Sequence, residues 1–141
     1  MSNEIVAAVV GEAIGVAGAG IGAYFAVFFQ QRIAAGLRLR EAFRDELVIL
    51  KDFGNGTNPE PLLNNAFYKH HAAIIEFRHS INAVSRQGFD SAWNMYHRCY
   101  EDSEDKFFTQ YSVHLGGIKL AEKNRALAIS RIEHILSFTK S

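Results

Sequence analysis

Residues Ile5 to Phe29 form an apolar segment of twenty-five residues in which Glu12 is the one charged side chain. As a helix, a segment of that length is roughly 37 Å long, whereas the hydrocarbon core of a bilayer is roughly 30 Å thick. Helices of small soluble domains are rarely apolar on every face over such a length. The segment therefore predicts a single transmembrane helix. We expect residues 1–31 to form a membrane anchor and residues 32–141 to form a soluble domain.

A cleavable signal peptide is the main alternative to a permanent anchor. Signal peptides begin with basic residues and contain an apolar run of about 7–15 residues. No Lys or Arg precedes the apolar segment here, and the segment is longer than such a run, so an uncleaved anchor fits better. Four arginines follow it, namely Arg32, Arg38, Arg40 and Arg44. Because basic residues stay on the cytoplasmic side of a membrane, we expect the N-terminus outside and the C-terminal domain in the cytoplasm.

Four glycines of this segment share one face of the expected helix. They are spaced by four, three and four residues, at Gly11, Gly15, Gly18 and Gly22. Where a helix face lacks side chains, a second helix can approach closely and gain van der Waals contact, the usual basis of helix association in lipid. This glycine stripe predicts a homo-oligomer or a partner transmembrane helix. The alternative is that glycine is simply common in membrane helices.

Glu12 lies within the apolar segment and has two interpretations. An ionisable group in a membrane span is by default a functional candidate, for a proton path, for pairing with a partner, or for lining a pore made of several spans. However, Ala13 to Phe29 is seventeen residues, just enough to span a bilayer. Glu12 would then lie hydrated at the outer interface, which is the interpretation we favour.

The rest of the chain predicts an all-α fold. We expect the first helix to continue from Gln30 to about Asp52, with Ile33, Phe43, Leu47 and Leu50 on one side and Glu41, Asp45 and Asp52 on the other. The loop Gly54–Asn58 leads into a second helix from Pro59 to about Val84. Its seam follows the spacing of a packed helix, at Leu63, Phe67, His70, Ile74, Phe77 and Ile81.

Two further helices complete the prediction. A short one from about Asp90 to Glu101 presents an aromatic ridge of Phe89, Trp93, Tyr96 and Tyr100, and Gln87-Gly88 separates it from the second helix. The last runs from about Ile118 to Phe138, with Ile118, Ala121, Ile129, Ile132 and Leu136 facing inward. We assign no local structure to Asp102–Gly117. Three to four antiparallel helices joined by short turns predict an up-and-down bundle.

A few polar residues of this bundle are candidates for chemistry. His70 lies in the apolar seam and could be a ligand, a pH switch or a general base, although a neutral, hydrogen-bonded core histidine is the commoner case. Arg125 falls among inward positions of the last helix, where it could pair with an acid, bind an anion or extend its charge to solvent. Trp93 could stack on a base or a peptide, but its helical spacing favours a place in the core.

The histidines raise a metal hypothesis that the spacing does not support. Glu76 and His79 have the Glu-x-x-His spacing of di-iron bundles, but such a site needs two of these motifs and two more carboxylates. Both residues also fall away from the seam. His97 and Cys99 are two residues apart and would point about 200° from each other on a helix, so they cannot share one ion. We therefore assign no metal or catalytic residue.

Composition limits the remaining classes of function. Fifteen basic and fifteen acidic side chains give a net charge of zero, so nothing indicates a nucleic-acid-binding protein. The single cysteine, Cys99, excludes an internal disulfide. We therefore expect a membrane-anchored interaction or scaffold protein without a cofactor, which presents its bundle to an unidentified cytoplasmic protein. The alternative is a small membrane-bound metal or redox protein that uses histidines of the bundle.

Overall fold

The computed structural model describes residues 3–52, 57–98, 107–113 and 117–140, and it describes the side chains of the first helix from Gly20 onward. The helices are α1 (Asn3–Asp52), α2 (Pro59–Ser80), α3 (Ala83–His97) and α4 (Gly117–Ser137), with single 3-10 turns at Thr109–Tyr111 and Phe138–Lys140. Within these described ranges every element of regular secondary structure is a helix, and there is no strand. The predicted all-α class is confirmed.

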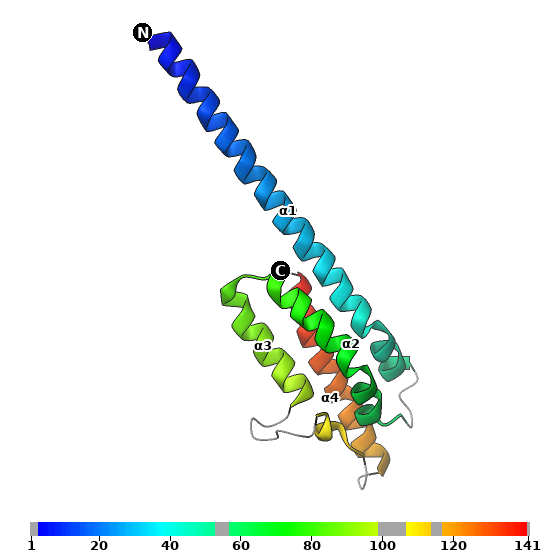
Figure 1. Cartoon of the computed structure of the whole chain (residues 1–141). Coiled ribbons are helices and arrows are strands. Elements are labelled where there is room, and N and C mark those ends of the chain that lie inside the picture. Colours follow the sequence, from blue (N-terminus) through cyan, green and yellow to red (C-terminus); the bar gives the residue numbers. More distant parts are fainter. Residues whose placement is uncertain (1–2, 53–56, 99–106, 114–116, 141) are drawn as a thin grey trace.

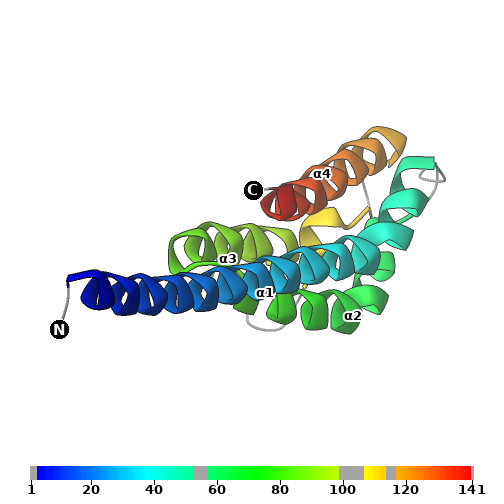
Figure 2. The same ribbon diagram turned by 90° about the horizontal axis from the view of Figure 1, so that it is seen from above.

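Helix α1 is one uninterrupted helix of 50 residues, about 75 Å long. Its C-terminal part packs against both α2 and α4, which lie on either side of it in Figure 2, while its N-terminal part projects from the bundle (Figure 1). The predicted continuation through Gln30 is confirmed. The expectation that Ile33 faces the core is wrong, because burial begins at Ala35 and Ile33 is 61% exposed.

Helix α2 begins as predicted but ends earlier. The Asn58 side chain accepts a hydrogen bond from the Glu60 amide at 3.2 Å, and Pro59 occupies the first turn. Five of the six predicted seam residues are buried, and Phe67 is partly buried. The helix stops at Ser80 instead of Val84 because Ile81 and Asn82 are extended and Asn82 caps the next helix, accepting a hydrogen bond from the Ser85 amide at 2.8 Å.

Helix α3 therefore begins seven residues before the predicted Asp90, and Gly88 lies inside it instead of breaking the chain. The reason is packing. The Phe138 ring packs over this part of α3, 3.4 Å from where a Cβ atom of Gly88 would lie, which is an ordinary van der Waals distance. The described part of the aromatic ridge is buried in the core as expected, namely Phe89, Trp93 and Tyr96. Tyr100 lies outside the described residues.

Helix α4 matches the predicted range to within one residue, but its inward face is rotated. Ile118 was expected inward and is 80% exposed, because the first turn of α4 extends past the core. Ala121, Ile129 and Leu136 are only partly buried. The buried stripe of this helix consists of Asn124, Ala128, Ile132 and Ile135. Asn124 is drawn inward by a hydrogen bond from its side-chain amide to the Ser112 carbonyl oxygen at 2.9 Å.

The predicted membrane span falls largely on residues whose side chains the structure does not describe. Among the described residues, no helix offers a stretch that is both long and apolar enough to cross a bilayer. Residues 5–19 of the apolar segment, which include Gly11, Glu12, Gly15 and Gly18, lie outside that set.

Candidate functional site

A chain of four polar side chains connects α1, α2 and α3 through the core. Lys69 donates a hydrogen bond from Nζ to Glu46 Oε1 at 2.8 Å. His70 Nε2 lies 3.1 Å from Glu46 Oε2, and His70 Nδ1 lies 3.0 Å from Tyr96 Oη. His70 and Tyr96 are fully buried and Glu46 is 6% exposed, while Lys69 lies at the surface. We call these four residues the buried polar chain.

Helical spacing places Glu46 at the interface between the helices. Glu46 lies three residues after Phe43 and four before Leu50, on the buried stripe of α1. The Phe43 ring stacks on the His70 imidazole with their centroids 3.8 Å apart, and its edge meets the Tyr96 ring. The polar atoms are therefore enclosed by aromatic rings, where an unpaired charge would be costly.

The protonation states of the chain follow from burial and hydrogen bonding. Burial alone raises the pKa of the Glu46 carboxyl, but hydrogen bonds from His70 and Lys69 outweigh it and lower that pKa to about 2. Burial lowers the pKa of His70 and raises the pKa of Tyr96 well above its ordinary value. At neutral pH the group is a carboxylate, a neutral imidazole and a phenol. His70 then donates from Nε2–H to Glu46, and Tyr96 donates its O–H to His70 Nδ1.

This arrangement stabilises the fold more readily than it supports a reaction. Both ring nitrogens of His70 are used inside the protein, so a role as a metal ligand or a general base requires breaking one of these hydrogen bonds. The Tyr96 carbonyl oxygen also accepts hydrogen bonds from the Tyr111 hydroxyl at 2.8 Å and from Gln110 at 2.9 Å. These bonds fasten the 3-10 turn Thr109–Tyr111 to the end of α3.

A second aromatic layer surrounds Trp93 beside the buried polar chain. The Phe67 ring stacks between Trp93 and Phe107, with centroid distances of 5.9 and 4.8 Å. His97 is 4% exposed and donates a hydrogen bond from Nδ1 to the Trp93 carbonyl oxygen at 2.6 Å. Burial lowers the pKa of His97 to about 4. Trp93 is thus a core residue, with 9% of its surface exposed.

The histidines do not gather with other ligands in the part of the chain that the structure describes. No group of three His, Cys, Asp or Glu side chains there is arranged to hold a metal ion. Glu76 and His79 are both exposed, and Glu76 forms an ion pair with Arg38. Cys99 lies outside the described residues.

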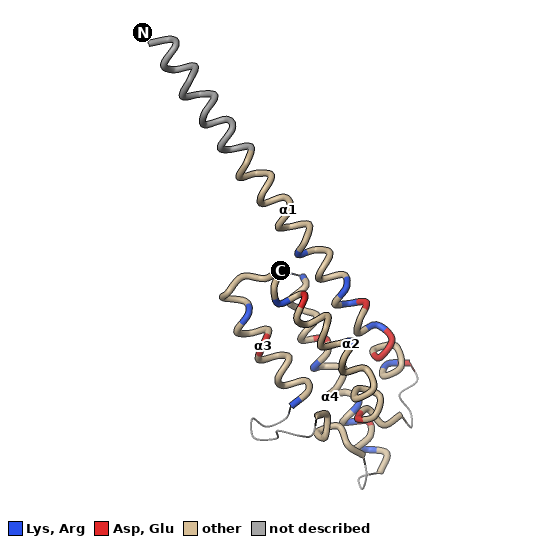
Figure 3. The backbone as a smooth tube through the Cα atoms, viewed as in Figure 1, with Lys and Arg blue, Asp and Glu red and all other residues tan. Residues whose placement is uncertain are grey.

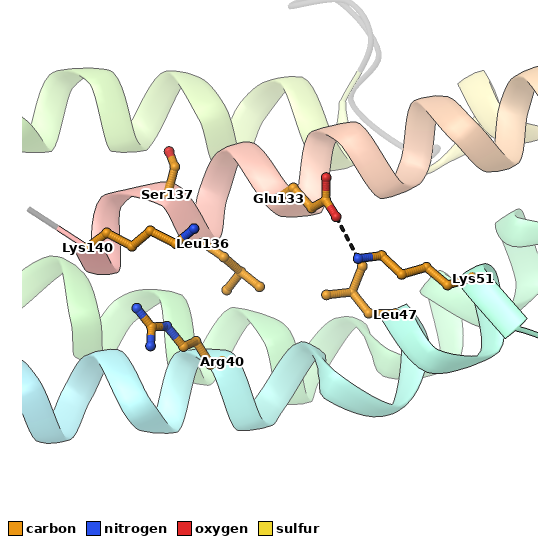
Figure 4. Close-up of a pocket in the computed structure, with 7 residues that line it drawn as sticks. All are labelled: Arg40, Leu47, Lys51, Glu133, Leu136, Ser137 and Lys140. Atoms are coloured by element: carbon orange, nitrogen blue, oxygen red, sulfur yellow. Dashed lines mark ion pairs between the residues drawn. The ribbon is translucent and has the colours of Figure 1, made fainter.

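A shallow groove of about 510 Å³ lies between α1, α4 and the C-terminal turn (Figure 4). Its lining consists of Arg40, Leu47, Lys51, Glu133, Leu136, Ser137 and Lys140. Lys51 and Glu133 form an ion pair across it at 2.6 Å. The groove carries positive charge, but it is open to solvent and its ion pair joins exposed side chains. Nothing in it selects one ligand.

The described part of the projecting helix exposes a continuous run of apolar side chains. From Gly20 to Phe29 every residue is uncharged, and all are exposed except the half-buried Phe28. The large side chains among them are more than half exposed, namely Ile21, Tyr24, Phe25, Val27 and Phe29. A Cβ atom on Gly22, the one described member of the glycine stripe, would meet nothing within 4 Å. This part of α1 is therefore uncovered within the single chain.

Arg125 has a role that the sequence analysis did not foresee. It is half-buried, and its Nη1 donates a hydrogen bond to the Leu50 carbonyl oxygen at 3.1 Å. That carbonyl belongs to the last turn of α1, where backbone acceptors lack partners within the helix. Arg125 therefore joins the end of α1 to α4.

Glu46 and Tyr96 were missed as members of a polar site. The signal for Glu46 is present in the sequence, since Leu39, Phe43, Glu46 and Leu50 follow the four-three-four spacing of a buried stripe. A carboxylate at such a position requires a partner in the core. The partners could not be identified in the same way, because the contact between His70 and Tyr96 depends on how α2 packs against α3.

Comparisons with known proteins add no relative: no family model, no curated protein and no solved structure matches the chain.

We predict that Glu46→Ala lowers the free energy of unfolding by about 3 kcal/mol, because it removes the buried acceptor of His70. Lys69→Ala removes only the exposed partner of the same carboxylate and is expected to cost less than about 1 kcal/mol. Glu46→Gln keeps an acceptor for His70 and should fall between the two. Chemical denaturation of the full chain in detergent, followed by near-ultraviolet circular dichroism, measures all three. Equal losses of unfolding free energy for Glu46→Ala and Lys69→Ala would contradict the role of Glu46 as the buried acceptor of His70.

We also predict that the bundle loses stability as the pH falls from about 6.5 towards 4. The pKa of His97 is about 4 in the folded chain and near 6.5 in the unfolded chain, so the unfolded chain takes up the proton first. The stabilisation from neutral His97 is complete above pH 6.5, and up to about 3 kcal/mol is lost on acidification. His97→Asn keeps a donor near the Trp93 carbonyl and should reduce the pH dependence of the free energy of unfolding, while buried His70, whose pKa is also lowered, is expected to account for part of what remains. His79→Asn, at an exposed position, serves as the control and should leave it unchanged.

Proposed function

We propose that this protein is a membrane-anchored interaction protein, whose α1 crosses the bilayer and holds the bundle at the cytoplasmic surface. The observation that carries the proposal is the uncovered apolar surface of Gly20–Phe29. Soluble proteins rarely expose a continuous apolar patch of this kind unless a partner or a membrane covers it. Fifteen further residues, Ile5–Ala19, precede this part in the sequence and contain a single charge. Together the twenty-five residues are long enough to cross a bilayer.

The charges that follow the apolar segment support the proposed orientation. No basic residue precedes the segment, whereas Arg32, Arg38, Arg40 and Arg44 lie within fifteen residues of its end. Arg38, Arg40 and Arg44 are exposed in the structure. Since the bias of Lys and Arg near a span sets its orientation, this pattern supports the proposal that the bundle lies in the cytoplasm and the N-terminus outside.

Self-association through the glycine stripe is the second part of the proposal. Gly22 is uncovered in the single chain, so that face is free for another helix at the described end of the stripe. Packing of small residues is the main source of helix association in lipid, because the hydrophobic effect does not act between helices there. A homo-oligomer, or a complex with another transmembrane helix, would cover this face.

An interaction role also agrees with how the polar groups of the bundle are used. Glu46, His70, Tyr96 and His97 all form hydrogen bonds within the protein. The groups left for a partner are therefore on the outside of the bundle. We propose that a cytoplasmic protein binds there. Self-association through the glycine stripe would then determine how many bundles are presented to that partner.

Membrane insertion is tested by extraction of membranes at high pH. The full chain should stay in the pellet, whereas Ala17→Arg places a charge at the centre of the apolar segment at a cost of about 2.5–3.5 kcal/mol and should release a large fraction. Gln31→Arg, an exposed position just after the segment, is the matched control and should behave as the unaltered chain. Complete release of the unaltered chain would refute the proposal.

Self-association is tested by the mass of the particle in detergent. Gly15→Ile and Gly18→Ile add bulk to the stripe and should shift the particle to the monomer. Gly20→Ile is the matched control, because Gly20 lies about 200° around the helix from Gly18 and a Cβ atom on it meets nothing within 4 Å. It should leave the mass unchanged. The same mass for all three variants would contradict a role for the stripe.

A further inference from the structure

We infer that the end of the bundle nearest the projecting helix docks on anionic phospholipid headgroups, with Val84 entering the interfacial region. The inference rests on the proposed membrane anchor. We call this end the basic end and define it by residues 30–40 of α1, 76–90 of α2 and α3, and 138–140. In Figure 1 the turn between α2 and α3 and the C-terminal turn both lie where α1 leaves the bundle.

Contacts along α1 place the basic end close to the predicted bilayer surface. A Cβ atom on Gly36 would lie 3.4 Å from Thr139 and 3.6 Å from the Phe77 ring, so these residues share one level along α1. Ile81, at the end of α2, is four residues beyond Phe77 and thus about 6 Å nearer the N-terminus of antiparallel α1. That level corresponds to residues 32–33, about one helical turn from Phe29, where the apolar segment ends.

The basic end carries most of the net charge of the described bundle. It contains six basic side chains, Arg32, Arg38, Arg40, Arg78, Arg86 and Lys140, and two acidic ones, Glu76 and Asp90, for a net charge of +4. The other described residues beyond Gln30 add only +1. Figure 3 shows this end as blue segments on α1, α2, α3 and the C-terminal turn.

The carboxylates of the basic end are already engaged, which leaves positive charge for an outside partner. Asp90 accepts two hydrogen bonds from Arg78, at 2.8 and 3.0 Å, and Glu76 pairs with Arg38. Arg86, by contrast, donates to the carbonyl oxygens of Arg78 and Ile81, which are neutral. These hydrogen bonds hold its guanidinium at the turn between α2 and α3, and they do not balance its positive charge as a carboxylate would.

Val84 supplies an apolar contact at the same place. It lies in the first turn of α3, two residues before Arg86, and is 89% exposed, the most exposed large apolar side chain described. An apolar side chain beside basic ones is typical of segments that lie in the membrane interface. The anionic lipids of a cytoplasmic leaflet complement this surface, and each Lys or Arg near such a leaflet strengthens binding about fivefold.

The test uses the full chain in nanodiscs, with a polarity-sensitive fluorophore on Gln87→Cys in a Cys99→Ser background. Gln87 is exposed and lies one turn from Val84, so Val84 itself is kept. We expect a blue-shifted, brighter signal when about 30% phosphatidylserine is added to phosphatidylcholine, and loss of this change at high salt. Arg86→Gln with Lys140→Gln should weaken docking about fivefold per charge removed. Lys119→Gln with Lys123→Gln, at the other end of α4, is the matched control and should behave as the parent.

The outcomes separate this inference from the proposed function. If the chain is not retained in nanodiscs of either composition, the membrane anchor itself fails. If it is retained in both but the signal does not respond to phosphatidylserine, or responds equally in the Arg86→Gln/Lys140→Gln variant, docking by the basic end is wrong. Arg86→Lys keeps the charge and should retain the response. If Arg86→Lys loses the response as fully as Arg86→Gln does, the response depends on the hydrogen bonds of Arg86 to the turn between α2 and α3 and not on its charge. That result would overturn the inference.

Discussion

The carboxylate of Glu46 is the constraint on which the packing of the bundle depends. Removing a carboxylate from water costs several kcal/mol unless donors replace the lost hydration. Two donors come from α2, and one of them, His70, is in turn held by Tyr96 of α3. A shift of α1 by one turn, about 5.4 Å, would leave the carboxylate without these donors. The relative positions of three helices therefore follow from one buried charge, in addition to the apolar contacts around it.

The continuity of α1 makes the bundle and the proposed anchor a single mechanical unit. The helix has no proline, and its one glycine between Arg32 and Asp52 is Gly36, whose face is packed against Thr139 and Phe77. That packing brings the C-terminal turn close to α1 at the level where the helix leaves the bundle. A tilt of α1 in a bilayer would thus tilt the bundle with it. Because Gly36 is packed on this face, it does not serve as a hinge.

Helical periodicity was sufficient to predict the all-α fold, the buried seam of α2 and the core position of Trp93, and the lack of Gly-Pro breaks predicted the continuity of α1 to Asp52. The prediction failed where the same sequence pattern is compatible with two different structures. Gly88 looked like a helix break, but it lies inside α3, where the ring of Phe138, fifty positions away in the sequence, packs over it. The inward face of α4 was mispredicted because apolar residues occupy more of the helix circumference than the core covers. The hydrogen bond of Asn124 to the Ser112 carbonyl oxygen turns a different face of α4 towards the core. Of the buried polar chain, His70 was recognised from its place in the seam, whereas its partners depend on tertiary packing.

Two surfaces of this chain act on different energetic terms, and their positions make them additive. The apolar part of α1 gains free energy by leaving water, a gain that does not depend on the charge of the lipid. The proposed docking of the basic end would gain free energy only where the surface is anionic, and salt would weaken that gain. Because residues 32–33 of α1 lie level with the turn that carries Val84 and Arg86, both surfaces can engage one membrane together. On the proposed arrangement, the helix would determine whether the chain is in a membrane, and the basic end would determine which lipids surround it and how the bundle is oriented on the membrane surface.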